Sequence, residues 1–156
     1  QTFQQWGLTL TSLANVLPDL KGTNLTSPRD LAQLIASIAS GEIVSLPSRD
    51  RILDIMKDTE NDSLLPQGLG KGAKIAHKTG DIGSILADAG LVDLPNGKRY
   101  IAVTIVQRPN NDDRAGELIR QISSVAYQHF DRTAAPVTAQ TEPQEQSTQQ
   151  ARSTQP

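Results

Sequence analysis

Three segments of the chain place apolar residues every three to four positions, the spacing that buries one face of an α-helix. The first follows Ser27, a good capping residue, has Pro28 at its first helical position, and ends at Gly41. The second begins near Ser48, and residues 110–113 start the third. The apolar positions that we expect these helices to bury are Leu31, Leu34, Ile35 and Ile38; Ile52, Leu53, Ile55 and Met56; and Leu118, Ile119, Ile122, Val125, Ala126 and Phe130.

Between the second and third helical segments the pattern becomes typical of β-strands. Residues 73–79, 85–94 and 99–107 are rich in Ile, Leu, Val and Ala, and Pro95-Asn96-Gly97-Lys98 separates the last two runs. Asn-Gly tolerates a positive φ and is therefore a strong hairpin signal. We predict an antiparallel meander of about three strands with the third helix covering one side, an α/β fold of the α+β type.

The composition changes near Arg132. Residues 133–156 are mostly Thr, Gln, Pro, Ala and Ser, and Val137 is the only large apolar residue among them. Such a stretch cannot bury enough surface to offset the entropy of ordering it. We therefore predict a folded portion over residues 1–131 and a disordered tail over 132–156, with a tether as the functional alternative for the tail.

The charge balance and the composition exclude several classes of protein. With 15 Lys and Arg against 17 Asp and Glu, the formal charge is −2, so we expect no nucleic-acid partner. The chain has no Cys, and its only imidazoles are His77 and His129, so we predict neither a metal site nor a cofactor. No apolar run approaches the ~18 residues that span a bilayer. The first residue is Gln1, and we expect the native start to lie upstream.

The segment with the most chemical content is Lys78-Thr79-Gly80-Asp81, at the end of the first predicted strand. A strand-end Lys places a cation beside a reacting group, and the adjacent Thr hydroxyl can hold a substrate carboxylate. Gly80 lets a substrate backbone lie along the strand, and the next amide can point at an oxyanion. Lys-Thr-Gly alone is a weak motif. Its position before a hairpin and an amphipathic C-terminal helix matches the third motif of penicillin-interacting serine enzymes.

The resemblance extends well beyond this tripeptide. Residues 24–130 resemble the C-terminal half of the class A β-lactamase-like serine enzymes, and are most similar to their DD-peptidase branch, penicillin-binding protein A. The stretches that carry the resemblance are residues 26–32, 48–56, 75–83, 88–98 and 108–112. The resemblance implies a β-lactamase/transpeptidase-like fold, with helices packed on an antiparallel sheet, and a reaction that proceeds through a serine acyl-enzyme.

The resemblance also implies roles for individual residues. Lys78 would tune the electrostatics and proton transfer around the nucleophile, and the backbone N–H of Asp81 would supply half of an oxyanion hole. Thr79 would bind the substrate carboxylate, with Gly80 and His77 in the same substrate-binding segment. We interpret His77 as a packing or hydrogen-bonding neighbour rather than as a base.

The chain departs from the family pattern at the nucleophile. The family's nucleophile motif is Ser-x-x-Lys, and no serine of this chain has Lys three places later. The Ser-Asp-Asn motif is missing as well, and in the family both motifs lie upstream of the matched region. We therefore expect this chain alone to be inactive and to form no acyl-enzyme.

A second departure concerns the release of the acyl group. Class A β-lactamases use a glutamate before the Thr-Ser-Pro-Arg-Asp helix to activate the water that releases it. Leu17 stands at the expected place of that glutamate, and a leucine cannot accept a proton. Asp19 could substitute, but it lies two residues further on and is shorter than Glu. This difference favours a peptidase that penicillin inhibits over an enzyme that destroys penicillin.

The resulting functional hypothesis is part of a DD-peptidase that acts on D-Ala-D-Ala peptidoglycan stems. A class A β-lactamase hydrolysing β-lactams is one alternative, and a non-catalytic, truncated binding module is a second. The expected partners are a peptidoglycan stem peptide or a β-lactam, and the resemblance implies the cell envelope or periplasm. Arg114 and Arg120 could assist carboxylate binding or be ordinary surface charges. The sequence leaves the oligomeric state open.

The resemblance has one further structural consequence. In the resembled fold, the strand at 99–107 pairs with an N-terminal strand that lies outside the matched region. An unpaired apolar strand invites association with other chains. We therefore expect the isolated chain to be poorly soluble or marginally folded.

Overall fold

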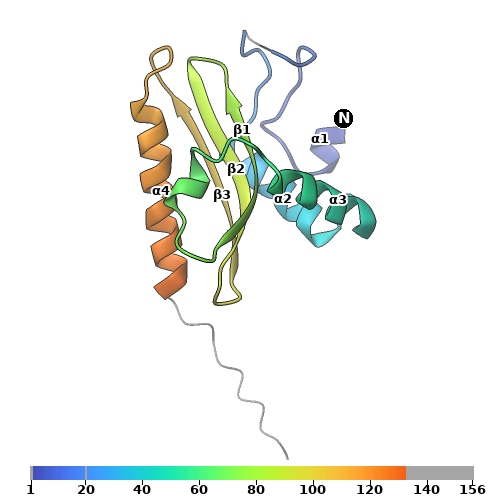
Figure 1. Cartoon of the computed structure of the whole chain (residues 1–156). Coiled ribbons are helices and arrows are strands. Elements are labelled where there is room, and N and C mark those ends of the chain that lie inside the picture. Colours follow the sequence, from blue (N-terminus) through green and yellow to red (C-terminus); the bar gives the residue numbers. More distant parts are fainter. Residues whose placement is uncertain (1, 20, 133–156) are drawn as a thin grey trace, which may run out of the picture.

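The computed structural model describes residues 2–19 and 21–132 of the chain. Its three strands form one antiparallel sheet in the order β1-β2-β3, with α4 on one side and α2 and α3 on the other (Figure 1). The elements are α1 (Thr2–Gln5), α2 (Pro28–Ser40), α3 (Leu46–Lys57), the 3-10 helix η1 (Leu65–Gly68), β1 (Lys74–Asp81), β2 (Ile85–Asp93), β3 (Arg99–Gln107) and α4 (Arg114–Arg132). The predicted fold class is confirmed, and the predicted tail lies outside the described residues from 133 onward.

Local capping explains where α2 and α3 begin. Ser27 Oγ accepts a hydrogen bond from the Asp30 backbone N–H over 3.1 Å, and Gly41, at φ 78°, ends the helix in the left-handed conformation. Helix α3 starts at Leu46, two residues before the predicted Ser48, because Ser45 rather than Ser48 is its cap. Near the N-terminus, Thr2–Gln5 form the short helix α1.

The hairpin between β2 and β3 has the predicted turn. The Leu94 N–H donates to the Lys98 carbonyl over 2.8 Å, and Gly97 has φ 82°. Strand β3 has the bounds that the pattern predicted, while β1 runs to Asp81, two residues beyond its predicted end. The extra length brings the whole Lys78–Asp81 segment into the regular ladder with β2.

The hydrophobic core lies between the sheet and α4. Side chains of β2 and β3 that point to this face alternate with side chains that point to α2 and α3. Two groups of residues fill the α4 side, and their buried members are Leu64, Leu65, Leu86, Ala115 and Ile119, and Val92, Leu94 and Tyr100. Helix η1 joins them, because the Ser123 hydroxyl on α4 donates to the Leu65 carbonyl over 2.7 Å.

Two predictions of helical burial were only partly right. On α4, Ile119 is fully buried, but Leu118, Ile122 and Val125 are exposed. The apolar stripe of α4 is wider than the face that a flat sheet can cover, so the helix carries a second apolar face that points away from the sheet. On α3 no residue is buried, and Ile55 is exposed. This helix contacts the sheet at its margin, through β1.

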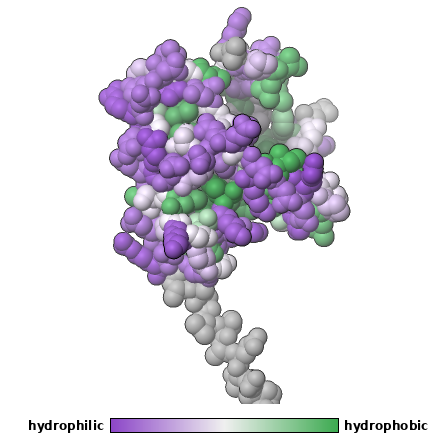
Figure 2. Space-filling model, in the orientation of Figure 1, coloured by the Kyte–Doolittle hydropathy of each residue, from purple (hydrophilic) through white to green (hydrophobic). Residues whose placement is uncertain are grey.

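Apolar surface is also exposed elsewhere. In the described residues, β1 and β3 each pair only with β2, which leaves the outer edge of both strands unpaired. Figure 2 shows hydrophobic surface between hydrophilic areas, including the loop at the upper right that precedes α2. The exposed apolar side chains of this loop are Leu10, Leu13, Val16, Leu17 and Leu25. None of the helices formed by the described residues is long and apolar enough to cross a membrane.

Candidate active site at the end of the first strand

The Lys-Thr-Gly segment lies at the C-terminal end of β1, on a strand at the edge of the described sheet. Lys78 is exposed, and its Nζ donates to the Thr79 carbonyl over 2.5 Å. Thr79 is half-buried, and within the described part of the chain its hydroxyl makes no hydrogen bond. Gly80 is exposed, and a Cβ at this position would meet no atom within 4 Å. The segment thus presents an ammonium, a free hydroxyl and an open stretch of backbone along one edge.

His77 differs from its neighbours because its side chain lies in the protein interior. It is 2% exposed, and Nδ1 lies 2.9 Å from Asp88 Oδ1 and 3.2 Å from Asp88 Oδ2. Asp88 is fully buried, and its Oδ2 also accepts the Leu65 backbone N–H over 3.0 Å. The His77 carbonyl accepts the Thr59 hydroxyl over 2.6 Å. His77 is therefore a hydrogen-bonded interior residue, in keeping with the interpretation that it is not a base.

Asp81, the last residue of β1, is held by two donors. Its Oδ1 accepts the Gly83 backbone N–H over 2.8 Å and Arg108 Nη2 over 2.6 Å. The Gly83 amide, followed by the Arg108 guanidinium, lowers the pKa of the Asp81 carboxyl below its usual value. Arg108 Nε also donates to the Gly83 carbonyl over 2.8 Å. The turn after β1 is thereby tied to the residue that follows β3.

A polar pocket of about 300 Å³ opens beside this turn. Asp81 and Arg108 line one side, and Arg120 lines the other. Arg120 Nη1 donates to the Ser63 carbonyl over 3.1 Å, and its other nitrogens bind Glu117. The pocket thus holds two guanidinium groups whose donors are largely engaged by the protein itself.

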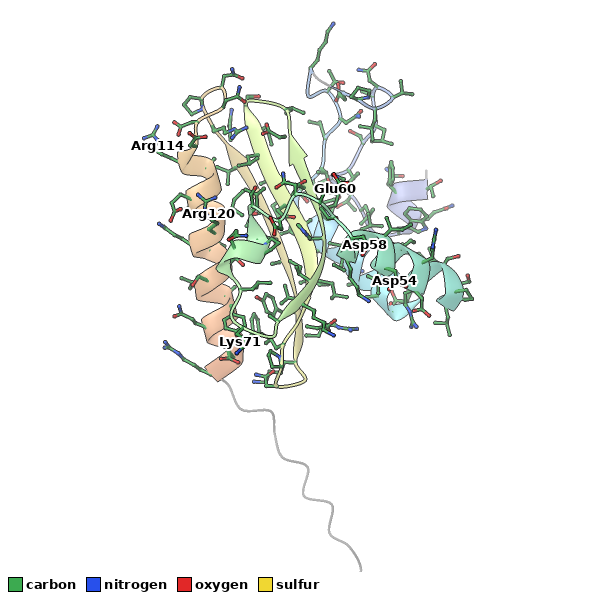
Figure 3. All side chains as sticks on the ribbon, in the orientation of Figure 1. Asp54, Asp58, Glu60, Lys71, Arg114 and Arg120 are labelled. Carbon is green, nitrogen blue, oxygen red and sulfur yellow. The ribbon has the colours of Figure 1, made fainter. Side chains whose placement is uncertain are left out.

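Arg114 and Arg120 of α4 differ in position, as Figure 3 shows. Arg114 lies at the start of the helix, points away from the sheet and pairs with Asp112 over 2.6 Å. That pairing, through side-chain and backbone hydrogen bonds from Arg114, lowers the pKa of Asp112 to about 2. Arg120 lies further along the helix and reaches the pocket. Arg114 fits the expectation of a surface charge, whereas Arg120 borders the candidate site.

The loop before α2 holds Leu17 and Asp19. Leu17 is exposed, and the Leu17–Pro18 peptide bond is cis. Asp19 accepts the Asn24 backbone N–H over 2.5 Å and the Thr23 hydroxyl over 2.9 Å. The Asn24 amide in particular lowers the pKa of the Asp19 carboxyl. Asp19 therefore serves as a hydrogen-bond acceptor that stabilises the loop, and a lowered pKa makes it a weak base.

Asp88 and Arg108 are the residues of this region that the sequence analysis missed. Asp88 interrupts an apolar strand, and a charged residue on the core face of a strand requires a buried partner. The sequence therefore indicates that Asp88 has a buried partner but does not identify that partner. Arg108 carried no comparable signal, because its contacts with Asp81 and Gly83 arise only when β1 and β3 lie in one sheet. Among the described residues, no group of His, Asp and Glu side chains is arranged to hold a metal ion.

Comparison with protein families gives a match over most of the chain. The model of the beta-lactamase enzyme family matches residues 1–130. A comparison with curated protein sequences found no significant match. The family match includes both the loop that holds Leu17 and the β1 segment that holds Lys78.

Solved structures resemble the chain closely over the same region. PBP-A is 61% identical, with a TM-score of 0.83, and the match covers 85% of this chain and 50% of PBP-A. A leucine-to-glutamate variant of PBP-A, solved as an acyl-enzyme complex with penicillin G, is 60% identical with the same TM-score and coverage. A β-lactamase from Chitinophaga pinensis is 27% identical, with a TM-score of 0.74, and the match covers 83% of this chain and 53% of that enzyme. The chain therefore spans about half the length of the proteins that it matches.

Proposed function

Because the chain belongs to the beta-lactamase enzyme family, we propose that it forms one part of a penicillin-interacting serine hydrolase, specifically a DD-peptidase acting on D-Ala-D-Ala peptidoglycan stems. The part proposed for this chain is the wall of the substrate cleft. The nucleophile, in this proposal, belongs to the half of the fold that PBP-A has and this chain does not span. The chain by itself is then inactive, and its place of action is the cell envelope or periplasm.

The roles proposed for β1 are those that the family resemblance implies, and the position of β1 at a sheet edge supports them. Lys78 supplies a positive charge near the attacking oxygen, and the Thr79 hydroxyl, which has no partner in the described residues, donates to the substrate carboxylate. The open backbone at Gly80 accommodates an extended peptide, and the Asp81 backbone N–H stabilises the developing oxyanion. A stem peptide and a β-lactam share the carboxylate and the carbonyl that these groups would recognise.

The environment of Leu17 and Asp19 is the observation that favours a peptidase over a β-lactamase. Rapid release of an acyl group needs a base that can take a proton from water. Leu17 has none, and both carboxylate oxygens of Asp19 accept hydrogen bonds that lower its pKa. A penicillin acyl-enzyme would therefore persist.

The test uses an intact enzyme, in which this chain is joined to the half of the fold that PBP-A has and this chain does not span. We expect stable labelling by benzylpenicillin, release of D-Ala from a peptide that ends in D-Ala-D-Ala, and negligible turnover of nitrocefin. Rapid nitrocefin turnover would instead establish the β-lactamase alternative. Absence of both labelling and D-Ala release would favour a non-catalytic binding module.

The proposed role of Lys78 has a matched control on the same strand. Lys78→Ala removes the cation at the site, whereas Lys74→Ala removes an exposed cation at the other end of β1. We expect the Lys78 variant to lose about 10²-fold or more in the rate of acylation by benzylpenicillin and the Lys74 variant to keep the parental rate. Equal rates in both variants would contradict the assignment.

A further inference from the structure

The side chains of His77, Thr79 and Asp88 point to the same face of the sheet. Thr79 and Asp88 are Cα partners across β1 and β2, and His77, two residues before Thr79, pairs with Gly90. Side chains of directly opposite residues in an antiparallel pair typically have Cβ atoms about 4.5–5.5 Å apart. The Asp88 carboxylate is thus an immediate neighbour of the hydroxyl that we propose to bind the substrate carboxylate.

Both carboxylate oxygens of Asp88 lie within hydrogen-bond distance of groups other than Thr79. Both lie within hydrogen-bond distance of His77 Nδ1, at 2.9 and 3.2 Å, and Oδ2 also accepts the Leu65 N–H. An ionised carboxylate can only accept hydrogen bonds, so the donor to an ionised Asp88 is Nδ1–H of the imidazole. The Thr79 hydroxyl makes no hydrogen bond to Asp88, although the two residues are opposite each other.

Removal of the His77 imidazole would change both the hydrogen bonding and the electrostatic environment of the Thr79 hydroxyl. Asp88 is 0% exposed, so water cannot replace the lost donor without entering the core. A buried carboxylate with too few donors would compete for the Thr79 hydroxyl proton. Its negative charge would also act, through a medium of low dielectric constant, against a second carboxylate on the other side of Thr79.

We infer that His77 is a positioning residue whose hydrogen bonds to Asp88 keep the Thr79 hydroxyl free to donate, and shield a substrate carboxylate from the buried negative charge. The inference rests on the proposed function, since it concerns the substrate carboxylate of that same site. It assigns His77 an electrostatic role that is separate from its contribution to packing. The ligands whose binding this role affects are acyl donors that bear a free carboxylate.

The test compares acylation of the intact enzyme by benzylpenicillin and by its methyl ester, which lacks the free carboxylate. We expect His77→Ala to lower the rate constant for the acid relative to that for the ester by about tenfold or more. Adding Asp88→Asn to His77→Ala removes the charge, and we expect this double variant to restore the acid-to-ester ratio. Should His77→Ala fail to fold, His77→Leu, which fills the space without supplying a donor, is compared with its own double variant in the same way.

Ser123→Ala is the matched control for a purely structural effect. It removes a buried hydrogen bond to the Leu65 carbonyl on the same side of the sheet without exposing a charge. We expect it to lower stability and to leave the acid-to-ester ratio unchanged. An equal loss for acid and ester in His77→Ala, or no recovery in the double variant, would overturn the inference while the proposed function stands. A parental intact enzyme that benzylpenicillin does not acylate would overturn both.

Discussion

The Arg108 guanidinium donates to the Asp81 carboxylate over 2.6 Å and so ties the last residue of β1 to the residue that follows β3. The Arg108 side chain is 7% exposed, whereas that of Asp81 is 53% exposed. The pair therefore has a buried cation that is anchored to the Gly83 carbonyl as well. This arrangement holds in place the turn that follows the proposed oxyanion-binding amide.

Arg108→Ala should destabilise the intact enzyme by about 1–3 kcal/mol, because it removes the guanidinium donors from the Gly83 carbonyl and the Asp81 carboxylate, each of which then keeps only a backbone N–H donor, from Asn111 and Gly83 respectively. Thermal or urea unfolding measures this change. Arg114→Ala is the control, since the Arg114 side chain is 86% exposed and its loss should change stability little. Similar unfolding midpoints for the two variants would contradict the importance of the Arg108 contacts.

The acid stability of the protein should depend in part on Asp81. Its pKa is lowered in the folded state, so its contribution to stability is present above the pKa of the unfolded chain and is lost as the pH falls through the folded-state pKa. Unfolding midpoints of the parent and of Asp81→Asn should therefore differ at neutral pH and converge in strong acid. The difference should be modest, because half of the side chain faces water. If the two unfolding midpoints differ by the same amount at all pH values, the effect of Asp81→Asn comes from packing and not from the charge of the carboxylate.

Leu17→Glu should accelerate the release of bound penicillin from the intact enzyme by about tenfold or more, because it introduces a general base into the loop. The first-order loss of labelled benzylpenicillin measures this rate. Leu13→Glu places the same charge on another exposed position of the loop and should leave the rate unchanged. Unaltered release in the Leu17 variant would mean that the loop is wrongly matched to the family.

The isolated chain should associate with itself or fold only marginally. The outer edge of β3 is unpaired in the described residues, and α4 exposes Leu118, Ile122 and Val125. Sedimentation velocity should show concentration-dependent association, which Ile122→Lys should reduce. A monomeric chain with a sharp, cooperative unfolding transition would contradict this expectation.

Tyr100→Phe should be neutral or slightly stabilising. Among the described residues, the Tyr100 hydroxyl is a buried group without a hydrogen-bond partner, and its ring stacks on Phe130 at a centroid distance of 4.6 Å. Burial raises the pKa of Tyr100 to about 12. Phe keeps the stacking and removes the desolvated hydroxyl, so equilibrium unfolding should show no loss of stability. A clear loss would reveal a partner for the hydroxyl in the intact enzyme.

The order of the elements and the position of the Lys-Thr-Gly segment could be predicted from the sequence, because their signals are local. The Ser27 cap, the Asn-Gly turn and the apolar run of β3 act over a few residues and do not depend on the rest of the chain. Two competing capping signals explain why the start of α3 was predicted two residues too late. Ser45 and Ser48 are both acceptable caps, and the choice between them changes only the first turn of α3.

The contacts that organise the site were decided by tertiary structure alone. His77 meets Asp88 across a distance of 11 residues, and Arg108 meets Asp81 across 27, so each pair depends on the register of the sheet. The apolar stripe of α4 likewise identified a helix, while packing against the sheet and η1 decided that Ile119 is buried and Val125 is not. Hydrophobic spacing specifies which element forms, but the partner of each side chain is set by how distant segments pack, and a linear pattern does not contain that information.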